Sequence, residues 1–229
     1  MKAPTPSYFT EISGMAAAVL VRARRGAPAR KTPELRGDQP VLVLPGYATS
    51  DSWTWWMRRE LRALGHDARG WGLGVNHGRV RELLPPLTER LSSFQAEAGR
   101  PVSLVGWSLG GLLARMLARE QPGSVARVIS LGSPVQGGPK YTSVAAAYEQ
   151  RGFDLDELEQ KVAEANQTPI PVPLTSVYTR RDTIVSWEAC IDPWNAHAEH
   201  HEVNTSHAGL ILCPETLDIV ARALVDGPG

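Results

Sequence analysis

The sequence has little cysteine and no net charge. Its 229 residues include only two cysteines, and 24 acidic residues balance 24 basic ones. Two cysteines cannot form the framework of a small disulfide-stabilised domain, and they suit a reducing compartment. A balanced charge gives no reason to expect nucleic-acid binding. We expect Cys190 and Cys213 to be small buried apolar residues, with a bridge between them as the alternative.

Long apolar runs are also lacking. The run at residues 12–21 is too short to cross a bilayer. Arginines follow this run, whereas in a secretory signal they precede the apolar segment. We therefore expect a cytoplasmic protein with neither a signal peptide nor a transmembrane helix.

The first 39 residues form an N-terminal arm in this interpretation. Seven basic and three acidic residues lie within residues 1–40, so the basic excess is local. We expect residues 12–21 to form a helix that docks on the domain, and residues 25–39 to be a linker. The alternative is peripheral membrane contact through Met15, Val19, Leu20 and the arginines that follow.

From residue 40 onward, short apolar runs alternate with longer segments of helical periodicity. This alternation predicts a single α/β domain, residues 40–229, with a mostly parallel sheet of about six strands flanked by helices. Thr49, Ser50 and Asp51 offer N-cap side chains for the first of these helices. The expected strands are residues 41–44, 68–71, 102–105, 125–131, 174–178 and 201–204, and the expected helices are 52–64, 80–97, 109–120 and 215–224.

Residues 133–173 interrupt this alternation. The segment begins and ends with runs rich in glycine and proline, and residues 142–150 and 155–166 within it have the pattern of short helices. An insertion at the carboxyl edge of a sheet is typical of a small cap over a pocket. A peripheral excursion with no gating role fits the pattern equally well.

The most informative motif is G-x-S-x-G around Ser108, present as GWSLGG at residues 106–111. An expected strand precedes it and an expected helix follows. Small residues on both sides let the chain reverse sharply and expose the serine hydroxyl at the tip of the turn. The backbone N–H of Leu109, at the start of the helix, would then face a developing oxyanion.

A serine nucleophile needs a base and an acid that orients the base. Asp182 follows the expected strand at 174–178, and His207 follows the one at 201–204. The order Ser, Asp, His along the chain fits this arrangement. The alternatives are a turn aspartate paired with Arg180 or Arg181 and an ordinary loop histidine, and the substitute acids would be Asp192, Asp154 and Asp156.

Further site residues follow from position. Gly46 permits a tight turn after the first strand, and the N–H of Tyr47 is the expected second oxyanion donor. Residues expected to shape the pocket are Trp53, Trp107, His77 and Tyr148. His66 ends a helix, where an imidazolium would interact well with the dipole. His197, His200 and His201 have no recognisable metal-ligand spacing, so we expect solvent-facing side chains and no metal site.

These motifs resemble the α/β-hydrolase superfamily, in particular its small bacterial lipase-like and esterase-like members, over about residues 40–225. The resemblance is carried by PGY at 45–47, GWSLGG at 106–111, LGSP at 131–134, RDTIV at 181–185 and SHAG at 206–209. The chain departs from larger members in having Pro45 where many have histidine, and in lacking the first two strands. Because of these departures, the resemblance does not specify the substrate class. The expected triad is unaffected by them.

The resemblance implies a serine hydrolase that cleaves a small ester or a lipid through an acyl-enzyme, without metal or cofactor. Ser108 would be the nucleophile, His207 the base and Asp182 its orienting acid. The alternatives are an acyltransferase with the same triad and a non-catalytic small-molecule-binding member of the fold. Apolar residues of the expected cap favour an apolar acyl group: Val144, Tyr148, Phe153, Leu155 and Leu158. The oligomeric state is not predicted.

Overall fold

Six parallel strands form one sheet in the part of the chain that the structure describes, residues 1–25 and 33–225 of a computed structural model. The strand order is β2-β1-β3-β4-β5-β6, and each neighbouring pair is parallel. The strands are β1 Pro40–Leu44, β2 Asp67–Gly70, β3 Val102–Trp107, β4 Val125–Leu131, β5 Leu174–Tyr178 and β6 Glu199–Glu202. The predicted fold class is therefore confirmed.

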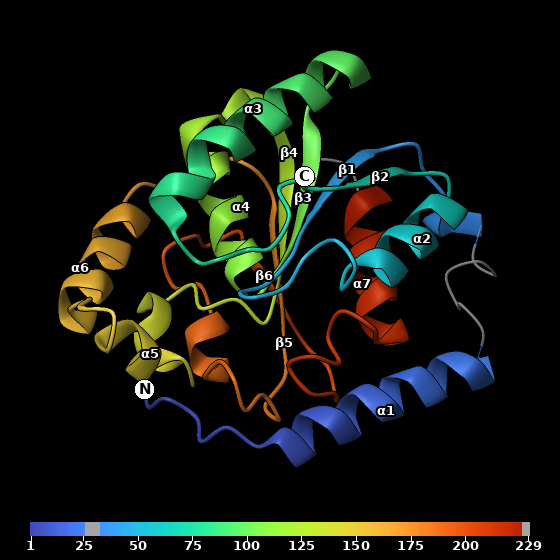
Figure 1. Cartoon of the computed structure of the whole chain (residues 1–229). Coiled ribbons are helices and arrows are strands. Elements are labelled where there is room, and N and C mark those ends of the chain that lie inside the picture. The colour runs from blue at the N-terminus through green and yellow to red at the C-terminus, as the bar shows by residue number, and fades with distance from the viewer. Residues whose placement is uncertain (26–32, 226–229) are drawn as a thin grey trace.

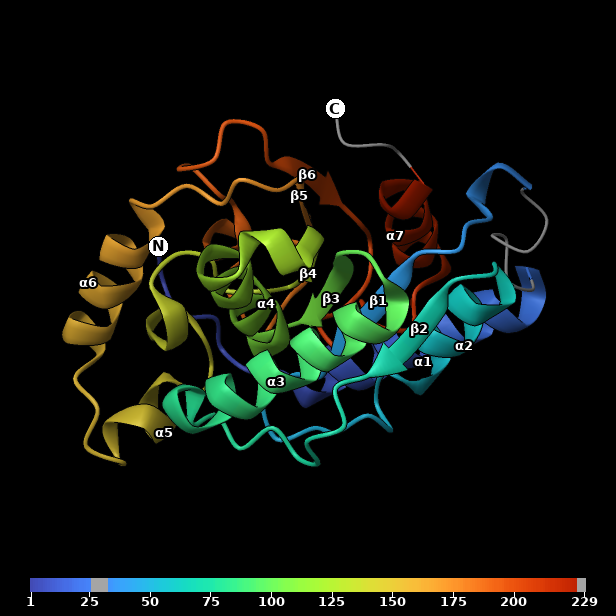
Figure 2. The same ribbon diagram turned by 90° about the horizontal axis from the view of Figure 1, so that it is seen from above.

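Helices cover both faces of this sheet (Figures 1 and 2). The helices α3 and α4 pack on one face, and α2 and α7 pack on the other. Their bounds are α2 Trp55–Ala63, α3 Val80–Ala98, α4 Leu109–Glu120 and α7 Pro214–Val225. All four lie close to the predicted helices.

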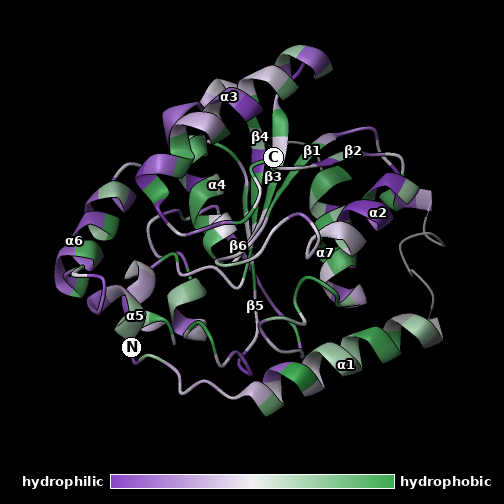
Figure 3. Cartoon of the chain, in the orientation of Figure 1, coloured by the Kyte–Doolittle hydropathy of each residue, from purple (hydrophilic) through white to green (hydrophobic). Residues whose placement is uncertain are grey.

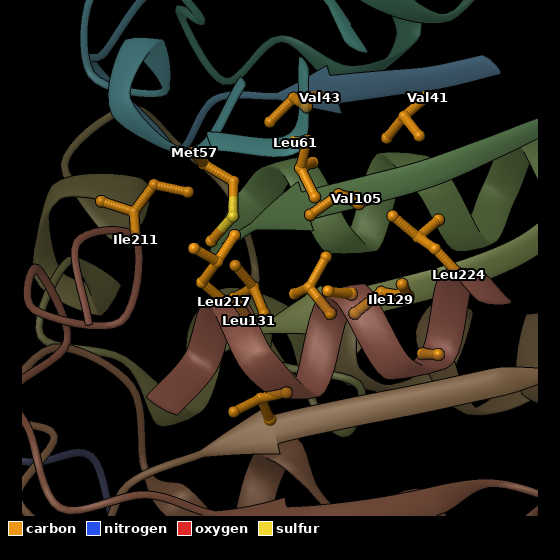
Figure 4. Close-up of a cluster of buried hydrophobic side chains, with 14 of the residues drawn as sticks. Val41, Val43, Met57, Leu61, Val105, Ile129, Leu131, Ile211, Leu217 and Leu224 are labelled. Atoms are coloured by element: carbon orange, nitrogen blue, oxygen red, sulfur yellow. The ribbon is translucent and has the colours of Figure 1, made fainter. Parts of the chain in front are cut away.

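Side-chain alternation along the strands explains this layering. In β1, Val41 and Val43 point into the cluster formed with α2 and α7 (Figure 4), whereas Leu42 and Leu44 point into the cluster formed with α3 and α4. Because both faces of the sheet are buried, its central strands are apolar at nearly every position. This is why the short apolar runs predicted them.

The segment between β4 and β5 contains a short 3-10 helix, η4 Gly138–Tyr141, followed by α5 Ala145–Glu149 and α6 Leu155–Asn166. The structure gives α6 the predicted bounds, and Asp154 caps it by accepting hydrogen bonds from two backbone N–H groups. The other predicted helix is shorter than 142–150. Thr142 is extended and forms an antiparallel bridge with Val185. Ser143, whose N–H donates to the carbonyl of Ile184, and Val144 form a turn before the helix begins.

The N-terminal helix, α1 Tyr8–Arg25, runs along the edge of the molecule beside the turns that follow β5 and β6 (Figure 1). It docks on the domain, with Glu11 and Ala18 buried. Much of the helix is nevertheless coloured as hydrophobic in Figure 3. Several of its large side chains are exposed, among them Tyr8 and Phe9 at 83% each. Peripheral membrane contact through Met15, Val19, Leu20 and the arginines that follow stays a prediction.

Two sequence expectations are corrected in the connecting segments. Of the predicted linker at 25–39, residues 26–32 lie outside the described residues, but Pro33–Leu35 forms a 3-10 helix with Leu35 buried. The strand β6 begins two residues earlier than predicted, since its exposed polar residues carry no apolar pattern. No helix in the described ranges has the length and apolarity needed to cross a membrane.

Two polar side chains near α2 also differ from expectation. Thr54 occupies the N-cap, but its hydroxyl makes no capping bond and donates instead to the carbonyl of Asp51. The Asp51 carboxylate accepts hydrogen bonds from the N–H groups of Trp71 and Gly72 after β2. His66 is buried, and this burial lowers the pKa of its imidazole. Burial therefore favours the neutral ring of His66, contrary to the expectation of an imidazolium that interacts with the helix dipole.

Candidate active site

Ser108 occupies the sharp turn between β3 and α4. Its backbone has φ 54° and ψ −122°, a conformation that costs energy for any residue with a Cβ. Its N–H donates to the carbonyl of Leu131 at the end of β4, 2.8 Å away. The strained turn is thus fixed to the neighbouring strand, as expected for a serine displayed at the carboxyl edge of the sheet.

The glycines of the motif make this turn possible. A Cβ on Gly106 would lie 2.4 Å from the backbone of Gly110, and a Cβ on Gly110 would lie 2.4 Å from the carbonyl oxygen of Leu44. Because neither glycine has a side chain, α4 can approach β3 and β1 closely. The spacing G-x-S-x-G therefore has a packing cause on each side of Ser108.

Asp182 and His207 meet at the carboxyl ends of β5 and β6. The Nδ1 of His207 lies 2.7 Å from Oδ2 of Asp182, and both side chains are buried. The other carboxylate oxygen accepts from the N–H groups of Ile184 and Val185, at 2.8 and 2.7 Å. Because a carboxylate only accepts, Nδ1 carries the proton and Nε2 of the neutral ring is the acceptor.

The electrostatics of this pair favour a charged His207. Burial of the imidazole disfavours its positive form, but the charge and hydrogen bond of Asp182 and the charge of Glu11 outweigh it and raise the pKa of His207. Arg180 and Arg181, the alternative partners of Asp182, bond instead to Glu202 and Asn204. The side-chain partner of Asp182 is therefore His207 and not Arg180 or Arg181.

One cavity connects these residues. It has a volume of about 200 Å³ and is lined by both Ser108 and His207. Most of its other walls are apolar or aromatic. The remaining lining residues are Gly46, Tyr47, Trp107, Leu109, Leu112, Pro134, Gly138, Pro139, Thr142, Ser143, Val144, Tyr148, Ile184 and Val185. Residues 133–173 therefore contribute to the cavity wall.

The loop after β1 borders the cavity through Gly46 and Tyr47. Asn76 forms hydrogen bonds to this loop. The sequence did not predict a role for this residue. It is fully buried, its Nδ2 donates to the carbonyl of Pro45, and its backbone exchanges hydrogen bonds with Ala48 and Thr49. The local pattern GVNHG at 74–78 marks a turn, but nothing in it separates Asn76 from its neighbour.

The predicted pocket residues divide into two groups. Trp107 and Tyr148 line the cavity, and the indole N–H of Trp107 also donates to the carbonyl of His207. Trp53 is 44% exposed and stacks on Trp107, but it is not among the residues that line the cavity. His77 is exposed and does not line the cavity, because its backbone turn points Asn76 inward instead.

Several other polar residues have structural partners. Asp192, a substitute acid at the sequence level, is buried against Arg115. His200 is half-buried and its Nε2 accepts from the N–H of Asp192, so it is not simply solvent-facing. Among the described residues, no three His, Cys, Asp or Glu side chains are grouped to hold a metal ion. Cys190 and Cys213 are buried and unbridged.

The comparisons with known proteins agree with this architecture. A thioesterase domain from the curacin biosynthetic pathway is 15% identical, with a TM-score of 0.59 over 85% of this chain and 92% of that one. A monoacylglycerol lipase from Paleococcus ferrophilus is 16% identical, with a TM-score of 0.59 over 82% and 94%. A lipase-esterase related protein from Clostridium acetobutylicum ATCC 824 is 14% identical, with a TM-score of 0.61 over 85% and 94%.

At these identities the likeness to solved structures shows the fold alone, and no curated protein matches the sequence. The family is shown by a different comparison. The model described as the alpha/beta hydrolase family matches residues 41–223, which span β1 to α7. The chain therefore belongs to the alpha/beta hydrolase family.

Proposed function

We propose that this protein is a serine hydrolase that cleaves carboxylic esters. The observation that supports it most is the buried 2.7 Å contact between Asp182 and His207 beside a cavity that also contains the strained Ser108. A protonated Nδ1 leaves Nε2 available to accept the serine proton. Structural likeness to lipases and esterases fits this chemistry without specifying it.

In the proposed reaction, Oγ of Ser108 attacks the ester carbonyl while Nε2 of His207 takes its proton. The backbone N–H groups of Tyr47 and Leu109 stabilise the oxyanion. The tetrahedral intermediate expels the alcohol, which receives the proton from His207, and an acyl-serine remains. Water then attacks the acyl-serine with the same proton transfers in reverse, which releases the acid and restores Ser108.

The cavity favours a short or aromatic acyl group over a long lipid chain. Its volume of about 200 Å³ is slightly larger than the apolar cavity of about 150 Å³ that accommodates benzene in an engineered protein core. Leu112, Val144 and Tyr148 give it apolar walls. We therefore propose a small-ester esterase rather than a long-chain lipase.

The test is hydrolysis of p-nitrophenyl acetate, butyrate, octanoate and palmitate by the wild type, by Ser108→Ala and by Ser52→Ala, an exposed serine control. We expect the fastest turnover with acetate or butyrate, and a loss of at least about 10³-fold in kcat for Ser108→Ala only. A fluorophosphonate probe should label the wild type and Ser52→Ala but not Ser108→Ala.

Two outcomes would contradict the proposed ester hydrolysis, and a third would contradict the proposed substrate size. Labelling of Ser108 without ester hydrolysis, together with acyl transfer to an added alcohol, would identify an acyltransferase. Neither labelling nor turnover would favour a non-catalytic binding protein of the same fold. A preference for palmitate would leave the chemistry in place but overturn the proposed substrate size.

A further inference from the structure

Glu11 of α1 contacts the two turns that carry Asp182 and His207. Its Oε1 accepts hydrogen bonds from the N–H and the hydroxyl of Thr183, at 3.3 and 2.8 Å. Its Oε2 accepts from the N–H of Ala208, at 2.9 Å. One carboxylate therefore connects the residue after Asp182 to the residue after His207, although these residues lie 172 and 197 positions away in the sequence.

The backbone of α1 strengthens this connection. The carbonyl of Glu11 accepts from the hydroxyl of Ser206, the residue before His207, at 3.2 Å. One turn further along, a Cβ on Gly14 would lie 2.3 Å from that same hydroxyl. The close approach of α1 to the histidine turn therefore depends on glycine at this position.

The side chain of Glu11 is only 8% exposed, yet it does not line the cavity. A buried carboxylate is costly unless its oxygens accept hydrogen bonds, and hydrogen bonds to an ionised acceptor are stronger than neutral ones. Here every named bond goes to a group within one residue of Asp182 or His207. An anchor for the helix alone would not require this distribution.

We propose that Glu11 is a positioning residue that holds the acid and histidine turns at the separation needed for the proposed ester hydrolysis, on which this inference rests. Its negative charge also faces His207. Burial opposes the imidazolium, but Asp182 and Glu11, the charged groups that act on the ring, together raise its pKa. Glu11 thus acts through His207 and Asp182, and it does not touch the substrate.

Small displacements of reacting groups reduce turnover more than substrate binding, because binding depends on the cavity walls and turnover on the alignment of the triad. We therefore expect Glu11→Gln, which keeps the length but loses the charge and one acceptor, to lower kcat about tenfold with KM changed less than about twofold. Glu11→Asp keeps the charge but is too short to reach both turns, so its kcat should also fall.

Two control variants separate this role from general effects. Thr10→Ala alters the same helix at a hydroxyl that bonds only to Ser7 within the described hydrogen bonds. Glu199→Gln removes one negative charge from the exposed strand β6. Both should keep the wild-type kcat and KM. Thermal unfolding of each variant sets an assay temperature at which all of them are folded.

The second readout is the pKa of His207, measured by NMR titration of its imidazole protons and assigned by comparison with His207→Asn. It should fall in Glu11→Gln and change less in Glu11→Asp. If kcat and this pKa both stay at their wild-type values while only the melting temperature falls, Glu11 is a structural anchor and the proposal is overturned.

Because the titration does not require turnover, it distinguishes this proposal from the proposed function. If no ester is hydrolysed even by the wild type but the pKa of His207 still falls in Glu11→Gln, the esterase proposal fails, whereas the action of Glu11 on His207 is supported. If the wild type hydrolyses esters and Glu11→Gln matches it in kcat and in the pKa of His207, only the role of Glu11 fails.

Discussion

The protonation state of His207 controls the proposed reaction. As a base it must be neutral, and Asp182 and Glu11 overcome the effect of burial to raise its pKa above the ordinary value of 6.5. The neutral fraction grows as the pH rises through that raised pKa. We therefore expect kcat/KM to increase with pH along a single titration with a midpoint above 6.5, followed with a p-nitrophenyl ester at a wavelength insensitive to ionisation of the product.

Asp182→Asn supplies the matching control for this prediction. The amide keeps the shape of the carboxylate but loses its charge, so the midpoint should move to lower pH while kcat falls by about 10³- to 10⁴-fold. A profile with its midpoint below 6.5 in the wild type, or an unchanged midpoint in Asp182→Asn, would contradict the assigned electrostatics of the pair.

Individual residues were predictable from sequence where their neighbours constrain them. Ser108 lies in a motif whose glycines have a local packing cause, and Asp182 and His207 each follow a strand, so local pattern was enough to select them. Glu11 and Asn76 could not be found this way. Their partners are distant in the chain, and a carboxylate in a helix or an amide in a turn is ordinary until the fold brings those partners together.

At the level of elements, the loop after β1 is held by another loop. Asn76 donates from its side chain to the carbonyl of Pro45, and its backbone bonds Ala48 and Thr49, so it fixes the segment that contains Tyr47. Asn76→Ala would leave a polar group unpaired at a buried position. We expect it to lower the free energy of unfolding by about 1–3 kcal/mol and to reduce kcat by weakening the placement of the Tyr47 N–H.

The adjacent residue provides the control. His77 is exposed and outside the cavity, so His77→Ala should leave both stability and kcat unchanged. Urea unfolding and p-nitrophenyl acetate hydrolysis measure the two effects. The reverse result would be an active Asn76→Ala and an impaired His77→Ala. It would contradict the described arrangement of this loop and support the prediction that His77 shapes the pocket.

The elements themselves were predicted well where apolar periodicity is strong and poorly where polar contacts decide. The strand β4 and the helix α4 have the predicted bounds, because burial fixes their pattern. The helix α6 also has the predicted bounds, although only Asn166 in it is buried, and Asp154 caps its start. The helix α2 begins at Trp55 rather than 52, since Asp51 bonds across to the end of β2 instead of capping. Capping competes with tertiary hydrogen bonds, and a single sequence does not show which partner is nearer.

At the level of the whole molecule, one buried ion pair joins α4 to the segment after β5. Arg115 and Asp192 approach to 2.5 Å, with their side chains 2% and 0% exposed, and Asn195 also donates to Asp192. Removing one partner leaves a buried charge unpaired. We expect Asp192→Asn to lower the free energy of unfolding at neutral pH by about 3–5 kcal/mol, and the double variant Arg115→Met with Asp192→Asn to recover part of this loss.

The same pair predicts how stability depends on acid. Burial alone would raise the pKa of Asp192, but the charge and hydrogen bond of Arg115 hold it below its ordinary value of 3.8. A carboxyl with a lowered pKa in the folded state stabilises the fold above 3.8, and this contribution disappears as the pH falls through the folded-state pKa. Urea unfolding at neutral pH and near pH 3 should therefore show a smaller acid-induced loss in the double variant than in the wild type. Equal losses in the two proteins would mean that Asp192 titrates in the folded protein as it does in the unfolded chain, and that the pair contributes nothing to acid sensitivity.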